Sequence, residues 1–125
     1  MTLNNAILTA DFICPNTVET EFKVKVISTL EGRMIKEILS RYVDVTYDVS
    51  FKGYEYERDS EKELIVESPY DEMYAHYLAA QIHLKLHEQP QYNNEMTIFQ
   101  SILEDYKVYM SQKHRRRGIS RYRVR

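Results

Sequence analysis

This chain of 125 residues has no tryptophan, one cysteine, three glycines and three prolines, and it lacks a long apolar run. A single cysteine, Cys14, excludes an internal disulfide and a zinc site built from several cysteines. No apolar stretch approaches the roughly 20 residues that a membrane-spanning helix requires. Residues 1–12 lack a basic start and a small-residue cleavage site, so we expect no secretory signal. These absences favour a reducing, cytosolic origin.

The net charge of −2 conceals two parts of opposite sign. Residues 1–112 carry ten basic and nineteen acidic side chains, a net charge of −9, whereas residues 113–125 carry seven basic side chains and no acid. An acidic body with a basic tail is typical of a protein that docks onto another surface, including another copy of itself. Eleven tyrosines fit this interpretation, because an apolar ring with a polar hydroxyl suits surfaces that become buried on assembly.

Residues 68–114 have the clearest helical pattern. Ser68, Pro69 and Asp71 predict a helix start, in which the serine caps free amides and the proline takes the first helical position. Residues 87–90 interrupt this helix, and a second apolar stripe follows at steps of four and three residues. Its members are Tyr92, Met96, Phe99, Leu103, Tyr106 and Met110. Because the turn is short, we expect two antiparallel helices packed stripe against stripe.

The N-terminal part predicts two further helices. Residues 2–12 have apolar positions along one side, and Pro15 separates them from the next helix, because a residue before proline is pushed out of the helical region. The second helix should begin between residues 16 and 20 and run to about Tyr42. Its apolar face comprises Phe22, Val26, Ile27, Leu30, Met34, Ile35, Ile38 and Leu39. Gly32 inside it costs about 1 kcal/mol relative to alanine, so we expect a neighbouring helix close by.

The period of the pattern changes at Val43. Residues 43–51 alternate between apolar and polar side chains, which predicts a strand with one buried face, and residues 64–66 can form the returning strand. Two strands are marginal alone, so the hairpin must lean on the helices or on a partner. The sequence therefore predicts a mainly α protein: a small bundle of three to four helices over residues 1–114, a projecting β-hairpin or extended loop at about 43–66, and an extended basic tail at 115–125.

Residue types that carry chemistry are present, but they form no complete catalytic or metal-binding motif. His83 and His87 share a helix face beside Glu88, which is the spacing of a two-histidine zinc site, yet the sequence indicates no further ligand. The acids at residues 71–72 are explained by the positive end of the helix dipole. A buried thiol is the default for Cys14. We therefore expect no catalytic residue, no metal and no cofactor.

The arginine-rich tail is the strongest functional signal among the residues. Three roles fit it: a solubilising end, contact with nucleic-acid phosphates supported by base stacking, or docking onto an acidic protein surface. Its candidate partner-binding residues are Arg115, Arg116, Arg117, Arg121, Tyr122, Arg123 and Arg125. The candidate subunit contacts are Tyr47, Val49, Phe51, Tyr54, Tyr56, Asn93 and Asn94. The two asparagines, poor helix formers within a helical stripe, are either solvent-exposed or hydrogen-bonded to the preceding loop or a neighbouring subunit.

Four segments resemble one family of phage proteins. They are PNT at residues 15–17, YDEMY at 70–74, YLAAQI at 77–82 and YNN at 92–94, and Phe99, Asp105, Tyr106 and His114 continue the pattern. The chain is similar, over roughly residues 3–114, to small head–tail connector (adaptor, or head-completion) proteins of tailed phages and prophages of Gram-positive bacteria. It departs from the family pattern in two places. Gln91 stands where an arginine is usual, and the basic extension is longer than usual.

The resemblance implies a non-enzymatic structural protein of the virion. About twelve copies would form a ring under the portal protein, extend the DNA channel and link the head to a tail-side connector or stopper protein. DNA would pass through without specific binding, and no membrane or cofactor would take part. The protein would lie at the head–tail interface after assembly in the host cytoplasm. The alternative is a small nucleic-acid-binding or DNA-packaging accessory protein that uses the arginine-rich tail.

Overall fold

The structure is a computed structural model that describes residues 1–116. Its elements are α1 (Leu3–Ile13), α2 (Thr20–Glu37), the 3₁₀ helix η1 (Leu39–Arg41), α3 (Tyr56–Asp59), α4 (Glu72–Lys85) and α5 (Gln89–Lys113). The predicted mainly α class and helical bundle are confirmed. Within this part of the chain, no helix has the length and hydropathy of a membrane span.

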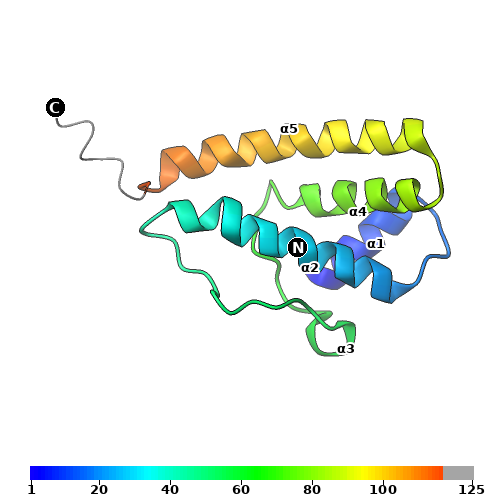
Figure 1. Cartoon of the computed structure of the whole chain (residues 1–125), viewed down its shortest axis with the longest axis horizontal. Helices are drawn as coiled ribbons and strands as arrows, with labels where there is room; N and C mark the ends of the chain where they lie inside the picture. The colour runs from blue at the N-terminus through cyan, green and yellow to red at the C-terminus, as the bar shows by residue number, and fades with distance from the viewer. Residues whose placement is uncertain (117–125) are drawn as a thin grey trace.

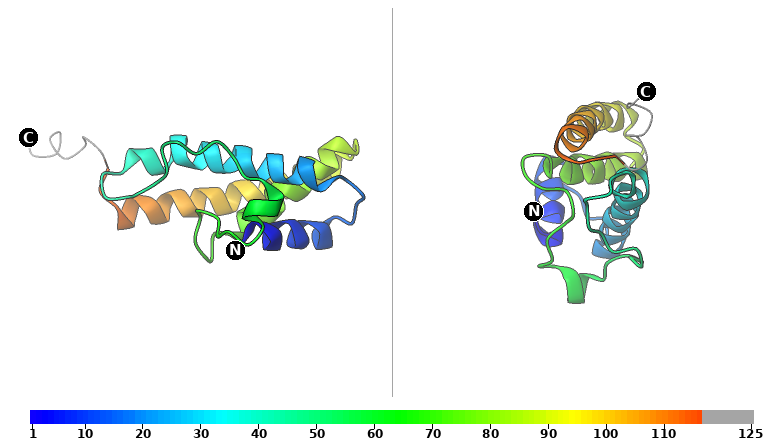
Figure 2. Two further views of the ribbon diagram at one scale, coloured as in Figure 1. Left: turned by 90° about the horizontal axis from the view of Figure 1, so that it is seen from below. Right: turned by 90° about the vertical axis from the view of Figure 1, so that its left-hand side faces the viewer.

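The four long helices stack in three layers with α4 in the middle (Figures 1 and 2). α5 covers one side of α4, while α1 and α2 pack on the other side. Buried side chains therefore occur nearly all round α4: Met73, Tyr74, Ala75, Leu78, Ala79, Ala80 and Ile82. A helix that is covered by three neighbours needs apolar residues on every face, which a single predicted stripe understates.

The predicted antiparallel pair of α4 and α5 is confirmed. The turn between them places His87 in the left-handed region at φ 62°, and Pro90 lies in the first turn of α5. The stripe on α5 is buried at Phe99, Leu103, Tyr106 and Met110, and it is half-buried at Tyr92 and Met96. Tyr77 of α4 packs against Phe99 with ring centroids 4.8 Å apart. The spacing of apolar residues alone was sufficient to predict this contact surface.

The predicted start of α4 is wrong by several residues. α4 begins at Glu72, no side chain among residues 1–116 caps it, and Ser68 is exposed. Asp71 instead uses its carboxylate to bind the N-terminal ammonium group of Met1, at 3.1 Å. This ion pair ties the start of α4 to the start of α1, a long-range contact that the local cap motif does not reveal.

The helices α1 and α2 form where the sequence predicts them. Thr2 caps α1 by accepting a hydrogen bond from the Asn5 N–H at 3.1 Å. α2 ends at Glu37, five residues before the predicted end at Tyr42, and η1 continues the chain. The two helices are joined by an ion pair between Lys23 Nζ and Asp11 Oδ1 at 2.8 Å.

Gly32 lies in the middle of α2, and the expected close contact with a neighbouring helix is wrong. Among the atoms of the described residues, a Cβ added at this position would meet none within 4 Å beyond its chain neighbours and its own helix backbone. Because glycine is the less favourable residue in a helix interior, we expect Gly32→Ala to raise the free energy of unfolding by about 1 kcal/mol in urea denaturation. A matched control is Gly53→Ala, which should be destabilising because Gly53 has φ +125°. Loss of stability in Gly32→Ala would contradict the open surroundings of this glycine.

The predicted β-hairpin at residues 43–66 is wrong. The described residues contain isolated bridges but no strand. Residues 43–55 are irregular and run alongside α2 to the start of α3 (Figure 1). The predicted alternation of buried and exposed side chains is only partly present. Val45, Tyr47 and Phe51 are half-buried, whereas Val49 is 84% exposed. The pattern therefore indicated which side chains face the helices, but it did not produce a sheet.

We call residues 64–66, where the returning strand was predicted, the returning segment. The backbone N–H groups of Ile65 and Val66 in this segment are bonded to side chains and are not available to a neighbouring strand. The Ile65 N–H donates to the Glu31 carboxylate at 2.9 Å, and the Val66 N–H donates to the Tyr74 hydroxyl at 2.8 Å. Strand pairing requires such backbone groups to bond across to a neighbouring strand. Side chains of α2 and α4 occupy them instead, so residues 64–66 are held against the bundle.

Candidate functional site

The start of the predicted partner-binding tail is described at Arg115 and Arg116, whose side chains are exposed. Their backbone does not project freely from α5. The Val43 N–H donates to the Arg115 carbonyl at 3.0 Å, and the Arg115 N–H donates to Asp44 Oδ1 at 3.1 Å. His114 Nδ1 also lies 3.2 Å from Asp44 Oδ2. The remaining predicted tail residues, Arg117, Arg121, Tyr122, Arg123 and Arg125, lie outside the described residues.

The predicted subunit contacts fall in two separate places. We call residues 42–71, which join η1 to α4, the connection. Five of the predicted contacts belong to it: Tyr47, Val49, Phe51, Tyr54 and Tyr56. The other two, Asn93 and Asn94, are exposed at the start of α5. Asn93 Oδ1 accepts a hydrogen bond from Gln89 Nε2 at 3.0 Å. Tyr54 bonds internally through its hydroxyl, and Tyr56 donates to Asn4 Oδ1 at 2.9 Å. The structure therefore does not gather the seven residues on one surface.

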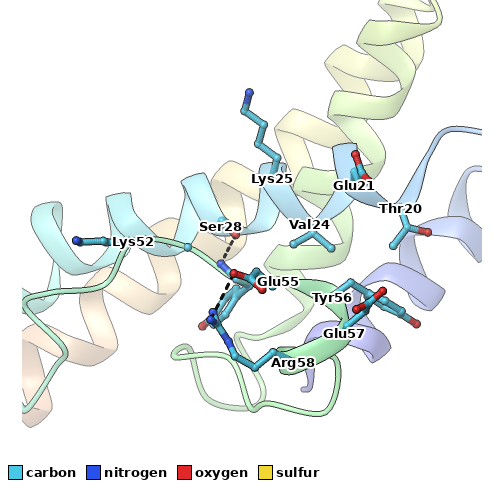
Figure 3. A pocket seen from close by; sticks show the side chains of 12 residues that line it. Thr20, Glu21, Val24, Lys25, Ser28, Lys52, Glu55, Tyr56, Glu57 and Arg58 are labelled. Atoms are coloured by element: carbon cyan, nitrogen blue, oxygen red, sulfur yellow. Dashed lines mark hydrogen bonds and ion pairs between the residues drawn. The ribbon is translucent and has the colours of Figure 1, made fainter.

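A groove of about 810 Å³ lies between α2, residues 52–55 and α3 (Figure 3). Its charged lining mixes both signs: Lys25, Lys52, Arg58, Glu21, Glu55 and Glu57. Arg58 is paired with Glu55 at 3.5 Å, and the hydroxyl of Ser28 accepts the Tyr54 N–H at 2.8 Å. Among the lining residues, these groups are spread out or already paired, so they do not converge on one point as a catalytic set does.

A buried carboxylate, Glu31, organises the core beneath the connection. It is fully buried and accepts hydrogen bonds from the Tyr74 hydroxyl, the Tyr54 hydroxyl at 2.7 Å and the Ile65 N–H at 2.9 Å. Burial raises the pKa of Glu31, and the hydrogen bonds offset this rise only in part. Burial and the nearby Glu31 charge raise the pKa of both tyrosines, which therefore remain donors. This network joins α2, α4 and the connection, as expected for a structural anchor.

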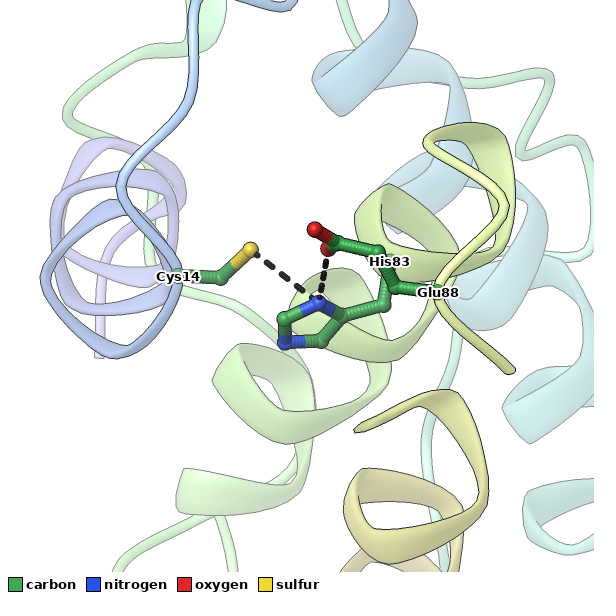
Figure 4. A group of neighbouring side chains, drawn as sticks. All are labelled: Cys14, His83 and Glu88. Atoms are coloured by element: carbon green, nitrogen blue, oxygen red, sulfur yellow. Dashed lines mark hydrogen bonds and ion pairs between the residues drawn. The ribbon is translucent and has the colours of Figure 1, made fainter. Parts of the chain in front are cut away.

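A second cluster brings together Cys14, His83 and Glu88 (Figure 4). Cys14 Sγ lies 3.5 Å from His83 Nδ1, which lies 2.7 Å from Glu88 Oε1. Cys14 follows α1, His83 is in the last turn of α4, and Glu88 precedes α5. The sequence pointed to His83 with His87 and Glu88, but His87 is exposed in the turn and is not part of the cluster. Cys14 and His83 are separated by 69 positions in the sequence, and no sequence signal predicted their contact.

The surroundings of Cys14 keep its thiol protonated. Burial raises the pKa of this thiol, the negative charges of Glu88, Glu95 and Asp11 raise it further, and Lys23 acts in the opposite direction. The thiolate is the reactive nucleophile, so these surroundings disfavour covalent catalysis by a cysteine–histidine pair. A bound cation would reverse this preference, because a metal-bound thiol is readily deprotonated.

Exposed apolar side chains lie on one face of α1 and near the end of α4. Phe12 is 88% exposed and Leu8 is 57% exposed, four residues apart on one face of α1. Leu84 and Leu86, at the end of α4, are also exposed. The contact between Cys14 and His83 places these two helix ends next to each other. We call Leu8 and Phe12, which are neighbours on the exposed face of α1, the corner patch.

The corner patch, the groove beside α3 and the Cys14–His83–Glu88 cluster are three features of the described residues that can contact other molecules. The first is apolar, the second carries mixed charge, and the third holds three metal-ligand atoms. No family model, curated protein or solved structure matches this chain.

Proposed function

We propose that the protein is a non-enzymatic head–tail connector of a tailed phage or prophage, which assembles as a ring beneath the portal protein. The resemblance at residues 15–17, 70–82 and 92–94 supports this function. The structural observation that carries it is the corner patch, above all the 88% exposure of Phe12. Large apolar side chains left in water mark surfaces that are covered on assembly.

The occupant of the corner patch in this proposal is a second copy of the chain. In a ring, each copy uses two different surfaces, one for the neighbour on each side. The apolar patch of one copy therefore meets a different surface of the next copy. The 25 residues of α5 make a helix of about 37 Å that can support such repeated contacts. The corner patch lies at one end of the bundle, where it is accessible to a neighbour.

The charge distribution fits a ring of copies through which DNA passes without being bound. Residues 1–112 carry a net charge of −9, and a surface of this sign repels the phosphate backbone. The basic residues that begin at Arg115 suit an acidic surface of the portal protein or of a neighbouring copy. The alternative, a DNA-packaging accessory protein, would bind duplex DNA through the same arginines, with a strong dependence on salt.

Replacing Phe12 by serine should shift the ring toward monomer, because the patch loses its largest exposed apolar side chain. Native mass spectrometry of the chain, alone and with portal protein, measures the distribution of copies. Val108→Ser is the matched control, since Val108 is also exposed but lies on α5, outside the patch. We expect the control to form the same ring as the unmodified chain.

Two results would contradict the proposal in different ways. An unmodified chain that stays monomeric in the presence of portal protein would contradict the connector function. A ring that is as stable in Phe12→Ser as in Val108→Ser would instead contradict the role of the corner patch. A salt-sensitive complex with duplex DNA at physiological ionic strength would favour the accessory protein.

A further inference from the structure

We propose that Cys14, His83 and Glu88 form a zinc site, in which one thiolate, one imidazole nitrogen and one carboxylate oxygen bind the ion and a water completes the coordination. All three ligand atoms come from one chain and lie within 4.8 Å of one another. Sulfur, imidazole nitrogen and carboxylate oxygen are the three ligand types that Zn²⁺ takes in proteins. The site therefore does not depend on ring formation.

The distances agree with tetrahedral coordination after a small movement of one side chain. Bonds of about 2.3 Å to sulfur and about 2.0–2.1 Å to nitrogen place these two ligand atoms roughly 3.5 Å apart around a tetrahedral ion. Cys14 Sγ and His83 Nδ1 are 3.5 Å apart. Glu88 Oε1 is nearer to His83, at 2.7 Å, and has to move outward. Its side chain is 44% exposed, so it has room to do so.

The hydrogen bonding of the cluster also favours a cation at its centre. Cys14 and Glu88 both approach the same nitrogen, His83 Nδ1. A neutral imidazole carries on that nitrogen either one hydrogen or one lone pair, so the carboxylate and the sulfur share a single hydrogen-bond partner. An ion between the three groups binds a lone pair from each, and the thiol proton is released to solvent on binding.

The electrostatic surroundings are suited to a divalent cation. The negative charges of Glu88, Glu95 and Asp11 act on Cys14, and Lys23 is the opposing positive charge. Glu95 is itself bound to His76 at 2.7 Å, so it is occupied and remains a neighbour of the site. Cys14 is only 4% exposed, and Glu88 forms the more open side through which the ion would enter.

A bound ion would tie the end of α1 to the turn between α4 and α5. These segments are far apart in the sequence, and in the described residues they meet at this corner of the bundle (Figure 4). Since the unfolded chain does not hold the three ligands together, binding should stabilise the fold. Phe12 lies two residues before Cys14 and Leu84 lies one residue after His83, so the ion would also fix the positions of these two exposed side chains.

The test uses the full chain, freed of metal with a chelator, kept reduced, and titrated with Co²⁺ and then Zn²⁺. Cobalt should bind one ion per chain and give the near-ultraviolet charge-transfer absorption of a thiolate ligand, which an equimolar amount of Zn²⁺ removes. Zinc in excess should raise the melting temperature by roughly 5–10 °C.

Substitutions distinguish metal binding at this site from metal binding elsewhere on the surface. Cys14→Ser should abolish the charge-transfer absorption. His83→Gln and Glu88→Gln should weaken Zn²⁺ binding at least about tenfold, since even residues that only orient a metal ligand contribute about 10- to 100-fold. His87→Asn is the control, because it removes an exposed neighbouring histidine and keeps a residue that tolerates φ 62°. We expect it to bind Zn²⁺ as the unmodified chain does.

Two outcomes would overturn the site. The first is an unmodified chain that shows no thiolate absorption with Co²⁺. The second is Zn²⁺ binding of equal strength in Cys14→Ser and in the unmodified chain. Circular dichroism of each variant without metal shows whether it is folded, and a variant that is not folded is replaced by alkylation of the single thiol, which should block cobalt binding.

Discussion

Replacing Glu31 by alanine should lower the free energy of unfolding by about 3–5 kcal/mol, because each buried donor left without an acceptor costs about 1–3 kcal/mol. The Tyr74 hydroxyl, the Tyr54 hydroxyl and the Ile65 N–H all donate to this carboxylate. Their loss would release the returning segment at residues 64–66 from α2. For a domain of ordinary stability, about 5–15 kcal/mol, this is a large fraction of the total.

Urea denaturation followed by circular dichroism measures the effect. Glu37→Ala is the matched control on the same helix, since Glu37 is exposed and, within residues 1–116, its carboxylate bonds only to Arg33, at 3.2 Å. We expect the control to unfold almost as the unmodified chain does. Glu31→Gln should lie between the two, because its amide keeps one oxygen acceptor but replaces the other by a donor. Equal stabilities for Glu31→Ala and Glu37→Ala would show that the network does not hold the connection.

Replacing Tyr74 by phenylalanine should lower the free energy of unfolding by about 2–4 kcal/mol, although the ring and its packing are retained. The Tyr74 hydroxyl is the link between two buried groups. It donates to Glu31 and accepts the Val66 N–H at 2.8 Å. Phenylalanine would leave both of these groups without that partner in a region closed to solvent.

Tyr56→Phe is the control for this substitution, because the Tyr56 hydroxyl donates to Asn4 in an exposed hydrogen bond. Its removal should change the free energy of unfolding very little. Combining Tyr74→Phe with Glu31→Ala should cost less than the sum of the two single changes, because both remove the same hydrogen bond. Additive effects, or equal effects for Tyr74→Phe and Tyr56→Phe, would contradict a shared network.

Local sequence patterns were sufficient to predict the helices. Apolar spacing located α1, α2, α4 and α5, and the break at residues 87–90 correctly predicted that α4 and α5 pack side by side. Spacing works here because a helix repeats every 3.6 residues, so the side that is buried is written into neighbouring residues. The corner patch was also within reach of this reasoning. Leu8 and Phe12 share one face of α1, away from the buried Leu3, Ala6 and Ala10.

Glu31 shows where such patterns become insufficient. It lies within the apolar face of α2, next to Leu30 and four residues after Ile27, which is a signal for a buried acid. Its partners, however, are Tyr54, Ile65 and Tyr74, and no local rule connects residues so far apart in the chain. The predicted hairpin failed for the same reason. The period of two in residues 43–51 is real, but amides of the returning segment bond to Glu31 and Tyr74 instead of a strand.

The amino-acid sequence by itself determined the helices, their apolar faces, the acidic body and the basic tail, because each depends on neighbouring residues or on composition. Only the tertiary structure decided that α4 is buried nearly all round, that Glu31 anchors the connection, and that Cys14 meets His83 and Glu88. These features arise from contacts between distant segments. A polar group that is removed from water needs a hydrogen-bond partner inside the protein. Such partners can come from any part of the chain, so only the whole fold determines them.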